Sequence, residues 1–146
     1  NILEIIKNLE MSKVFETEQD LKNEFDVIRK IAKGQEIIKL DKFGLDYEIV
    51  GKAFIEIKCY KIKSNQFKHT IVSLIKLVKM QKASRKLPTF LFIQFLDKIK
   101  YINIKDISGE MKIGGRKPRE GSTNDLEFLC YVDNDKFTTF KINENE

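Results

Sequence analysis

The sequence predicts a mixed α/β domain, and two kinds of pattern indicate this class. Short runs rich in β-branched and aromatic residues, bounded by Gly, Asp and Pro, are typical of strands. Longer segments with apolar residues three and four positions apart are typical of amphipathic helices. They follow one another as two helices, three strands, one helix and two strands, an order that favours a sheet with helices packed against it.

Size and composition agree with a single folded domain. The chain has 146 residues, 42% of them hydrophobic and 34% charged, which is typical of a globular protein with a hydrophobic core. We expect one domain over 1–146, with its core at about 18–104, a basic loop at 105–125 and a last strand at 126–132.

Two helices are expected before the first strand. The first covers residues 2–10, and its apolar side consists of Ile2, Ile5, Ile6 and Leu9. The second begins near Thr17, a residue type that caps helix N-termini, and ends at Gly34. Its expected apolar face consists of Leu21, Phe25, Ile28 and Ala32.

Three strands are expected next, at 36–40, 45–50 and 53–60. They are separated by turns at 41–44 and 51–52, both of which contain a glycine. The close spacing predicts antiparallel neighbours joined by short hairpins.

The second half begins with a long helix, predicted at about 67–86 and ended by Pro88. Its expected buried stripe consists of Phe67, Ile71, Leu74, Ile75 and Val78. Residues 89–96 form a nearly continuous apolar run, as expected of a central strand covered on both faces, and 100–104 form the next strand.

Charge and cysteine content restrict the class of protein. Basic residues outnumber acidic ones by 27 to 22, which suits nucleic-acid binding but also an ordinary solvated lysine surface. Cys59 and Cys130 are expected to be buried, reduced thiols, as in the cytoplasm of a bacterial host cell. The apolar run at 88–96 is too short to cross a membrane, and the lone His69 argues against a histidine-based zinc site.

The hairpin at 45–60 determines which charged side chains can act together. A two-residue turn would pair Val50 with Ala53, whereas a three-residue turn would pair Ile49 with Ala53. The second register puts the apolar residues of both strands on one face, so the pattern favours it. It also places Asp46 opposite Glu56, with Lys58 on the same side.

Two opposed carboxylates repel one another unless a cation lies between them. Mg²⁺ or Mn²⁺ would fill this role, because hard cations prefer carboxylate oxygens. Lys58 could then stabilise charge on a phosphate or lower the pKa of an attacking water. The alternative is a solvated sheet face on which Lys58 simply neutralises Glu56. Glu48, two residues from Asp46 on the same face, is either a ligand of a second metal or an ordinary solvated strand residue.

Asp46, followed by Glu56-Ile57-Lys58 on the next strand, resembles the motif of the PD-(D/E)xK nuclease superfamily, within which the chain is similar to small phage and prophage proteins. The resemblance covers about residues 18–104 and implies a restriction-endonuclease-like mixed sheet with core order α-β-β-β-α-β. The family motif has a Pro directly before the Asp, and this chain has Leu45 there instead. The helix after the third strand has no clearly placed glutamine motif, for which Gln81 is the candidate.

The resemblance implies Mg²⁺- or Mn²⁺-dependent hydrolysis of phosphodiester bonds in DNA. Asp46 and Glu56 would bind the metal, with the Ile57 carbonyl as a further ligand. Lys58 would orient water or stabilise charge. Glu24 on the preceding helix would hold metal-bound water or support Lys58; the alternative for Glu24 is an exposed helix edge paired with a lysine.

Basic residues near these positions are candidates for contact with nucleic acid. Lys61 and Lys63 follow the E-x-K strand, and His69 and Thr70 are expected at the start of the long helix, where phosphate could bind. Arg116 and Arg119 lie in a glycine-rich loop that also recurs in the similar phage proteins. The alternative for His69 and Thr70 is an ordinary helix cap, and the alternative for the basic residues is a solvated loop.

Three functions therefore remain open at the level of sequence. The leading prediction is a phage or mobile-element endonuclease that acts on nucleic acid, with no membrane partner. Since one domain cuts one strand per encounter, a homodimer is compatible with it. The second is a non-catalytic nucleic-acid-binding or interaction module on the same fold, and the third is a structural phage protein with a vestigial site.

Overall fold

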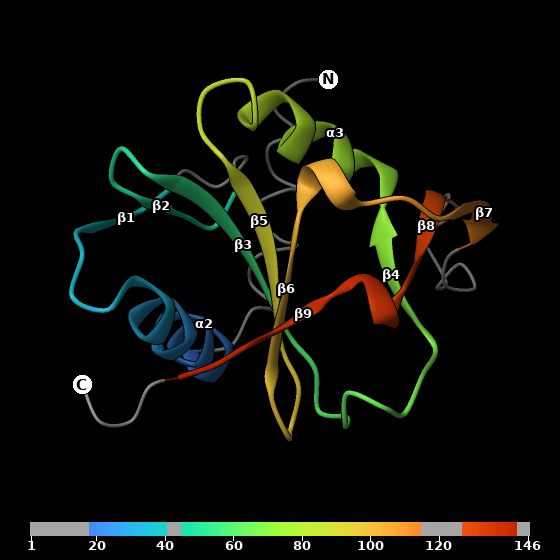
Figure 1. Cartoon of the computed structure of the whole chain (residues 1–146), viewed down its shortest axis with the longest axis horizontal. Coiled ribbons are helices and arrows are strands. Elements are labelled where there is room, and N and C mark those ends of the chain that lie inside the picture. Colours follow the sequence, from blue (N-terminus) through green and yellow to red (C-terminus); the bar gives the residue numbers. More distant parts are fainter. Residues whose placement is uncertain (1–17, 41–44, 115–126, 143–146) are drawn as a thin grey trace, which may run out of the picture.

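The computed structural model describes residues 18–40, 45–114 and 127–142. Its larger sheet has six strands in the order β1-β2-β3-β5-β6-β9 (Figure 1). Only the central pair, β3 and β5, is parallel, and every other neighbouring pair is antiparallel. The sheet is therefore mixed, as the sequence predicts.

All the strands of this sheet except the last lie within two residues of the predicted ranges. They are β1 (Ile37–Lys39), β2 (Tyr47–Ile49), β3 (Ala53–Cys59), β5 (Thr89–Gln94), β6 (Ile99–Asn103) and β9 (Thr138–Phe140). The apolar run at 89–96 is the central strand β5, buried between β3 and β6. No strand is predicted from the sequence at β9.

One face of the sheet packs against α2 (Glu18–Ala32). Val27, Ile28 and Ala32 of this helix are buried among Ile55, Ile57 and other apolar residues of β2, β3 and β5. The predicted face is correct only in its second half, because Leu21 and Phe25 are 41% and 44% exposed. Gly34 lies just beyond the helix with a φ of 82°, the left-handed conformation expected of a glycine at a helix end. The predicted helix at 2–10 lies outside the described residues.

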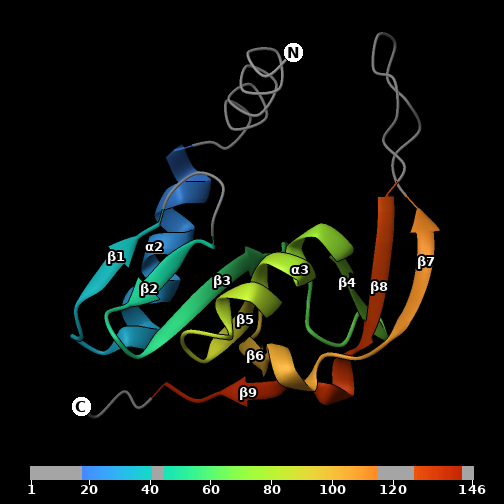
Figure 2. The same ribbon diagram turned by 90° about the horizontal axis from the view of Figure 1, so that it is seen from above.

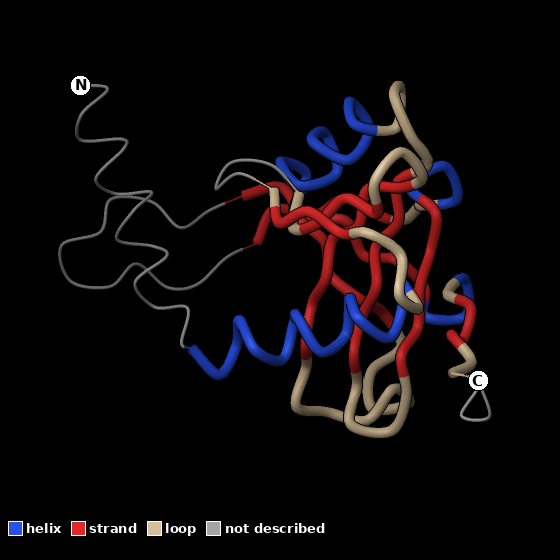
Figure 3. The backbone as a smooth tube through the Cα atoms, turned by 90° about the vertical axis from the view of Figure 1, so that its left-hand side faces the viewer, coloured by secondary structure: helices blue, strands red, loops and turns tan. Residues whose placement is uncertain are grey.

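The opposite face is covered by α3 (Leu74–Ala83) and a second, three-stranded sheet (Figures 2 and 3). This sheet consists of β4 (His69–Ser73), β8 (Glu127–Asp133) and β7 (Glu110–Gly114), in that spatial order. Val72 of β4, Cys130 and Val132 of β8 and Met80 of α3 join Leu91 and Ile93 of β5 in one core. Two short 3₁₀ turns, η1 (Ile104–Asp106) and η2 (Asn134–Lys136), follow β6 and β8.

The predicted long helix at 67–86 is wrong in its first part. Residues 69–73 form strand β4, in which Thr70 and Val72 are buried and His69 and Ile71 are exposed. Ser73 then begins α3, because its hydroxyl accepts a hydrogen bond of 3.2 Å from the backbone NH of Lys76. The predicted buried stripe is therefore exposed, with Ile75 at 63% and Val78 at 45%.

Two further expectations need correction. Part of the segment predicted as a basic loop, residues 110–114, forms strand β7 and pairs with β8. Cys59 is exposed at the end of β3, although Cys130 is buried as predicted and both thiols are free. In the described part of the chain, no helix is long and apolar enough to span a membrane.

Candidate active site

The β2–β3 hairpin has the three-residue turn that the apolar pattern favours. Ile49 pairs with Ala53, and Tyr47 with Ile55. Lys52 closes the turn by donating a 2.8 Å hydrogen bond to the Ile49 carbonyl. Gly51 has a φ of 72°, a conformation that side chains with a Cβ rarely adopt. The strand pairing ends at Tyr47 and Ile55, so Asp46 and Glu56 are not paired strand residues. The Asp46 carboxylate is nevertheless close enough to Glu56 for its charge to raise the pKa of that carboxyl.

The Asp46 side chain is held at the point where β2 and β3 stop pairing. Its Oδ2 accepts a 2.8 Å hydrogen bond from the Ile57 backbone NH, and so replaces a bond of the strand ladder. Its Oδ1 lies 3.7 Å from Nζ of Lys39, which is also 3.7 Å from Oε2 of Glu24. Lys39 therefore bridges Asp46 and Glu24. Glu24 has a lysine partner, as its alternative role expects, but its side chain is only 14% exposed and so does not lie on an exposed helix edge.

Glu56 is almost fully buried, with 4% of its surface exposed. Its Oε1 lies 2.8 Å from Nζ of Lys76, which reaches down from α3. Its Oε2 is buried and has no hydrogen-bond partner among the described residues. Burial raises the pKa of Glu56, and the charge of Asp46 raises it further, while Lys76 and Lys58 oppose the shift.

Lys58 lies two residues beyond Glu56 on the same face of β3, since side chains alternate along a strand. It forms no ion pair within 4.0 Å with any residue that the structure describes. Burial lowers the pKa of its ammonium group; the charge of Glu56 opposes the shift, and the nearby Lys76 adds to it. A lysine in this state exchanges a proton more readily near neutral pH than an exposed one does.

These residues suit a hard divalent cation held by two carboxylates. Among residues 18–40, 45–114 and 127–142, no group of three or more His, Cys, Asp or Glu side chains is close enough to bind a metal. Mg²⁺ needs fewer, because it often keeps several waters and takes one or two carboxylates from the protein. Oε2 of Glu56, which is buried without a hydrogen bond, and the nearby Asp46 carboxylate provide this donor set.

Glu48 is accounted for by the hairpin itself. Its Oε2 accepts a 3.1 Å hydrogen bond from the Gly51 backbone NH, so it stabilises the turn. The structure thus favours the ordinary strand role for Glu48 over that of a second-metal ligand.

Sequence reasoning missed Lys76, whose Nζ lies 2.8 Å from Oε1 of Glu56. Lys76 lies within the segment predicted as a long helix, but nothing in the local pattern directs it toward the E-x-K strand. The N-cap at Ser73 is the only local signal, because it fixes the start of α3 and hence the direction of Lys76.

The predicted nucleic-acid contacts differ in where the structure places them. Lys61, Lys63 and His69 are exposed on the segment between β3 and β4 or at its end. Thr70 is 4% exposed, and its hydroxyl donates a hydrogen bond to Oδ1 of Asn134. Because His69 and Thr70 belong to a strand, the expected phosphate site at a helix N-terminus is absent from this part of the described structure. Arg116 and Arg119 lie outside the described residues.

The fold and the paired carboxylates define a restriction-endonuclease-like class, and comparison with known proteins agrees. The family described as "Phage putative PDDEXK endonuclease" matches residues 10–140, and the chain belongs to that family. The structure is similar to that of the Holliday junction resolvase Hjc of Archaeoglobus fulgidus, with a TM-score of 0.56 and 11% identity over 86% of this chain and 93% of that chain. No curated protein matches the sequence.

Proposed function

We propose that this protein is a Mg²⁺- or Mn²⁺-dependent endonuclease that hydrolyses phosphodiester bonds in DNA, acting in the cytoplasm of a phage-infected bacterial cell. The main support is the environment of Glu56, a buried carboxylate beside Asp46 with one oxygen left without a hydrogen bond. A protein pays a folding cost for such a group. Membership of a phage endonuclease family supplies a reason for keeping it.

Each residue of the site has a role in this reaction. Asp46 and Glu56 would hold the cation, with the Ile57 carbonyl as a further ligand. When bound, the cation would supply a Lewis acid that polarises the phosphate and lowers the pKa of a water. Water then adds to phosphorus and one P–O ester bond breaks. The water loses a proton and the departing oxygen gains one.

Lys58 is the group best suited to charge and proton control. It projects from the same strand face as Glu56, and burial lowers its pKa. Its ammonium group would stabilise the negative charge that develops on the phosphate oxygens. Lys76 would keep Glu56 ionised before the cation arrives, because its charge lowers the pKa of that carboxyl. Glu24 would act through Lys39 to position Asp46.

A cleavage assay with supercoiled and linear DNA in Mg²⁺ or Mn²⁺ tests the proposal. Asp46→Ala and Lys58→Ala should each lower the rate by at least about 100-fold, because each removes a group that acts in the transition state. Asp106→Ala and Lys82→Ala provide matched controls, since both residues are exposed and neither forms an ion pair with a residue of the site. Full activity in either site variant would refute the assignment.

A binding module on the same fold is the second candidate, favoured by the pairing of Glu56 with Lys76. That pair could be a purely structural neutralisation, in which case the protein would bind DNA without a cation and without turnover. Calorimetry with Mn²⁺ distinguishes the two, because the module predicts no heat of metal binding. We also propose a homodimer, because a single domain cuts only one strand per encounter and two would be needed to cut both.

A further inference from the structure

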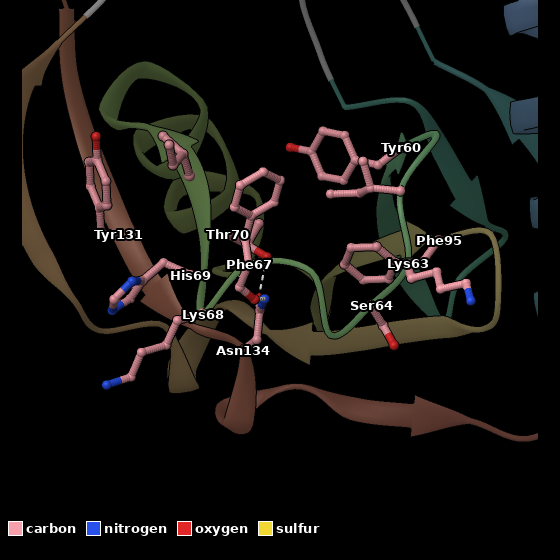
Figure 4. A pocket seen from close by; sticks show the side chains of 12 residues that line it. Tyr60, Lys63, Ser64, Phe67, Lys68, His69, Thr70, Phe95, Tyr131 and Asn134 are labelled. Carbon is pink, nitrogen blue, oxygen red and sulfur yellow. Dashed lines mark hydrogen bonds between the residues drawn. The ribbon is translucent and has the colours of Figure 1, made fainter.

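A recess lies between the two sheets, beyond the end of β3. It is a pocket of about 450 Å³, within the range of small-ligand sites. Its walls come from the segment that joins β3 to β4, from the end of β5, and from β8 with the turn after it. Figure 4 shows the rings of Tyr60, Phe67 and Phe95 around this space.

The pocket is aromatic and cationic. Besides those three rings, Tyr131 and His69 contribute aromatic surface, and their rings lie edge to face at 6.2 Å. Lys63 and Lys68 line its wall, and no Asp or Glu from the described ranges is part of the lining. Flat aromatic walls with cations nearby suit a ligand that combines a planar ring with a phosphate.

The chain that forms the wall is tied to the fold at several points. The Ile62 carbonyl accepts a 2.9 Å hydrogen bond from the Leu96 NH. Ser64 donates to Asp97 from both its NH and its hydroxyl, at 2.8 and 2.7 Å. Asn134 donates from Nδ2 to the Phe67 carbonyl at 2.6 Å. Phe67 can therefore be 58% exposed and still be held in place by its backbone, which lowers the entropy cost of binding.

The pocket continues the strand that carries the proposed active site. Glu56, Lys58 and Tyr60 follow at intervals of two residues, and Tyr60 extends the pairing with β5 by donating to the Gln94 carbonyl at 2.8 Å. Tyr60 lies against Phe95 with ring centroids 6.0 Å apart. A two-residue step along a strand is about 7 Å, so the pocket begins about that distance beyond Lys58. A nucleotide next to the cleaved phosphate would reach it.

We propose that this pocket binds one unpaired nucleobase of the DNA substrate, stacked against Tyr60 and Phe67, with Lys63 and Lys68 on the adjoining phosphates. The proposal rests on the proposed endonuclease function and refines it. It assigns the substrate class as DNA that offers a single-stranded segment beside a duplex, such as a fork or a flap. A fully paired duplex keeps its bases stacked inside and cannot fill the pocket without the cost of unpairing one of them.

The experiment measures binding without cleavage, in EDTA. The probe is a forked DNA with a short single-stranded arm that carries 2-aminopurine, a fluorescent adenine analogue whose emission falls when it stacks on an aromatic ring. Affinity is measured by anisotropy for the fork and for a blunt duplex of equal length. The wild type should bind the fork more tightly and quench the probe at one arm position.

The variant Phe67→Ala tests the stacking contact, because an exposed ring can be removed without unfolding the chain. Its affinity for the fork should fall by about 5- to 150-fold, the range given by one base–aromatic stack of about 1–3 kcal/mol. Affinity for the blunt duplex should change less than twofold, and quenching should be lost. Phe128→Ala is the control, since Phe128 is 53% exposed on β8 and does not line the pocket.

Three results would overturn the inference: equal affinities of wild type and Phe67→Ala for the fork, an equal loss for fork and duplex, or competition by a free nucleoside monophosphate at the same concentration as the fork. The last would assign the pocket to a mononucleotide. Failure of the nuclease proposal looks different, because fork-selective binding in EDTA would then persist while no DNA is cut with Mg²⁺ or Mn²⁺.

Discussion

Glu56 is the residue at which stability and proposed function conflict. Its carboxylate is 4% exposed, yet only one of its oxygens has a strong partner, at 2.8 Å in Lys76. Burial of a partly satisfied charge opposes folding, and the negative Asp46 nearby adds to the cost. A cation that binds both carboxylates would relieve this strain. Under the proposed function, the same geometry that weakens the metal-free protein would prepare it to bind the cation.

The variant Glu56→Gln should be more stable than the wild type when no metal is present. The pKa of Glu56 is raised above its ordinary value of about 4.5, so above that pH the folded state binds more protons than the unfolded state. Wild-type stability therefore falls as the pH rises through the window between the ordinary and the raised pKa. Because the glutamine carries no charge, the variant does not lose this part of its stability as the pH rises.

Urea denaturation in EDTA at pH 5 and pH 8 measures the effect. The gain in the free energy of unfolding for Glu56→Gln should be larger at pH 8 than at pH 5. An equal gain at both pH values, or a loss at pH 8 only, would contradict the raised pKa.

Lys76 should stabilise the fold only through Glu56. Lys76→Met keeps the aliphatic part of the side chain but leaves Glu56 buried without its cation, at a cost of about 1–3 kcal/mol near neutral pH. In the Glu56→Gln background the same change should cost much less, because the charge to be compensated is gone. Lys82→Met, on the exposed side of the same helix, serves as the control. Additive effects of the two substitutions would show that Lys76 acts independently of Glu56.

At the scale of elements, the sequence predicts what local periodicity determines. The β2–β3 register follows from alternating apolar residues, because a shift by one position would turn Tyr47 and Ile55 toward the wrong face. The segment at 67–86 has apolar residues that fit helical spacing as well as the strand alternation of Thr70 and Val72. The choice depends on the pairing of β4 with β8, about 60 residues later in the chain. Local spacing does not contain that long-range contact, so neither the second sheet nor the place of Lys76 could be predicted.

Two substitutions distinguish strand β4 from a helix at the same residues. Val72 is fully buried in the strand, whereas Ile75 is 63% exposed on α3. Val72→Ala should lower the free energy of unfolding by about 2 kcal/mol, through two lost methyl groups and the cavity left behind. Ile75→Ala should change it by less than about 0.5 kcal/mol. Urea denaturation measures both changes. A larger loss for Ile75→Ala than for Val72→Ala would contradict the strand and support the helix that the spacing predicts.

At the scale of the whole molecule, Glu56 and Lys58 of the proposed active site lie on the same side of the larger sheet as the aromatic pocket. Glu56, Lys58 and Tyr60 project from β3 on the side that α3 and the second sheet cover, while α2 packs on the other side. The second sheet has two effects: it packs against α3, whose Lys76 covers Glu56, and β8 supplies a wall of the aromatic pocket. This arrangement explains why the pocket could not be predicted, since its lining comes from three separate segments of the chain.

Metal binding should stabilise the whole fold, because the carboxylates come together only in the folded chain. A ligand that binds only the folded state adds about 2.7 kcal/mol at 100 times its dissociation constant. Titration with Mn²⁺ should therefore raise the thermal unfolding midpoint by several degrees and then saturate. Asp46→Asn should lose most of this response, whereas Glu48→Gln should keep it, since Glu48 is engaged with the hairpin turn. A rise that does not saturate, or one that is equal in wild type and Asp46→Asn, would indicate nonspecific ion effects and favour the binding module over the enzyme.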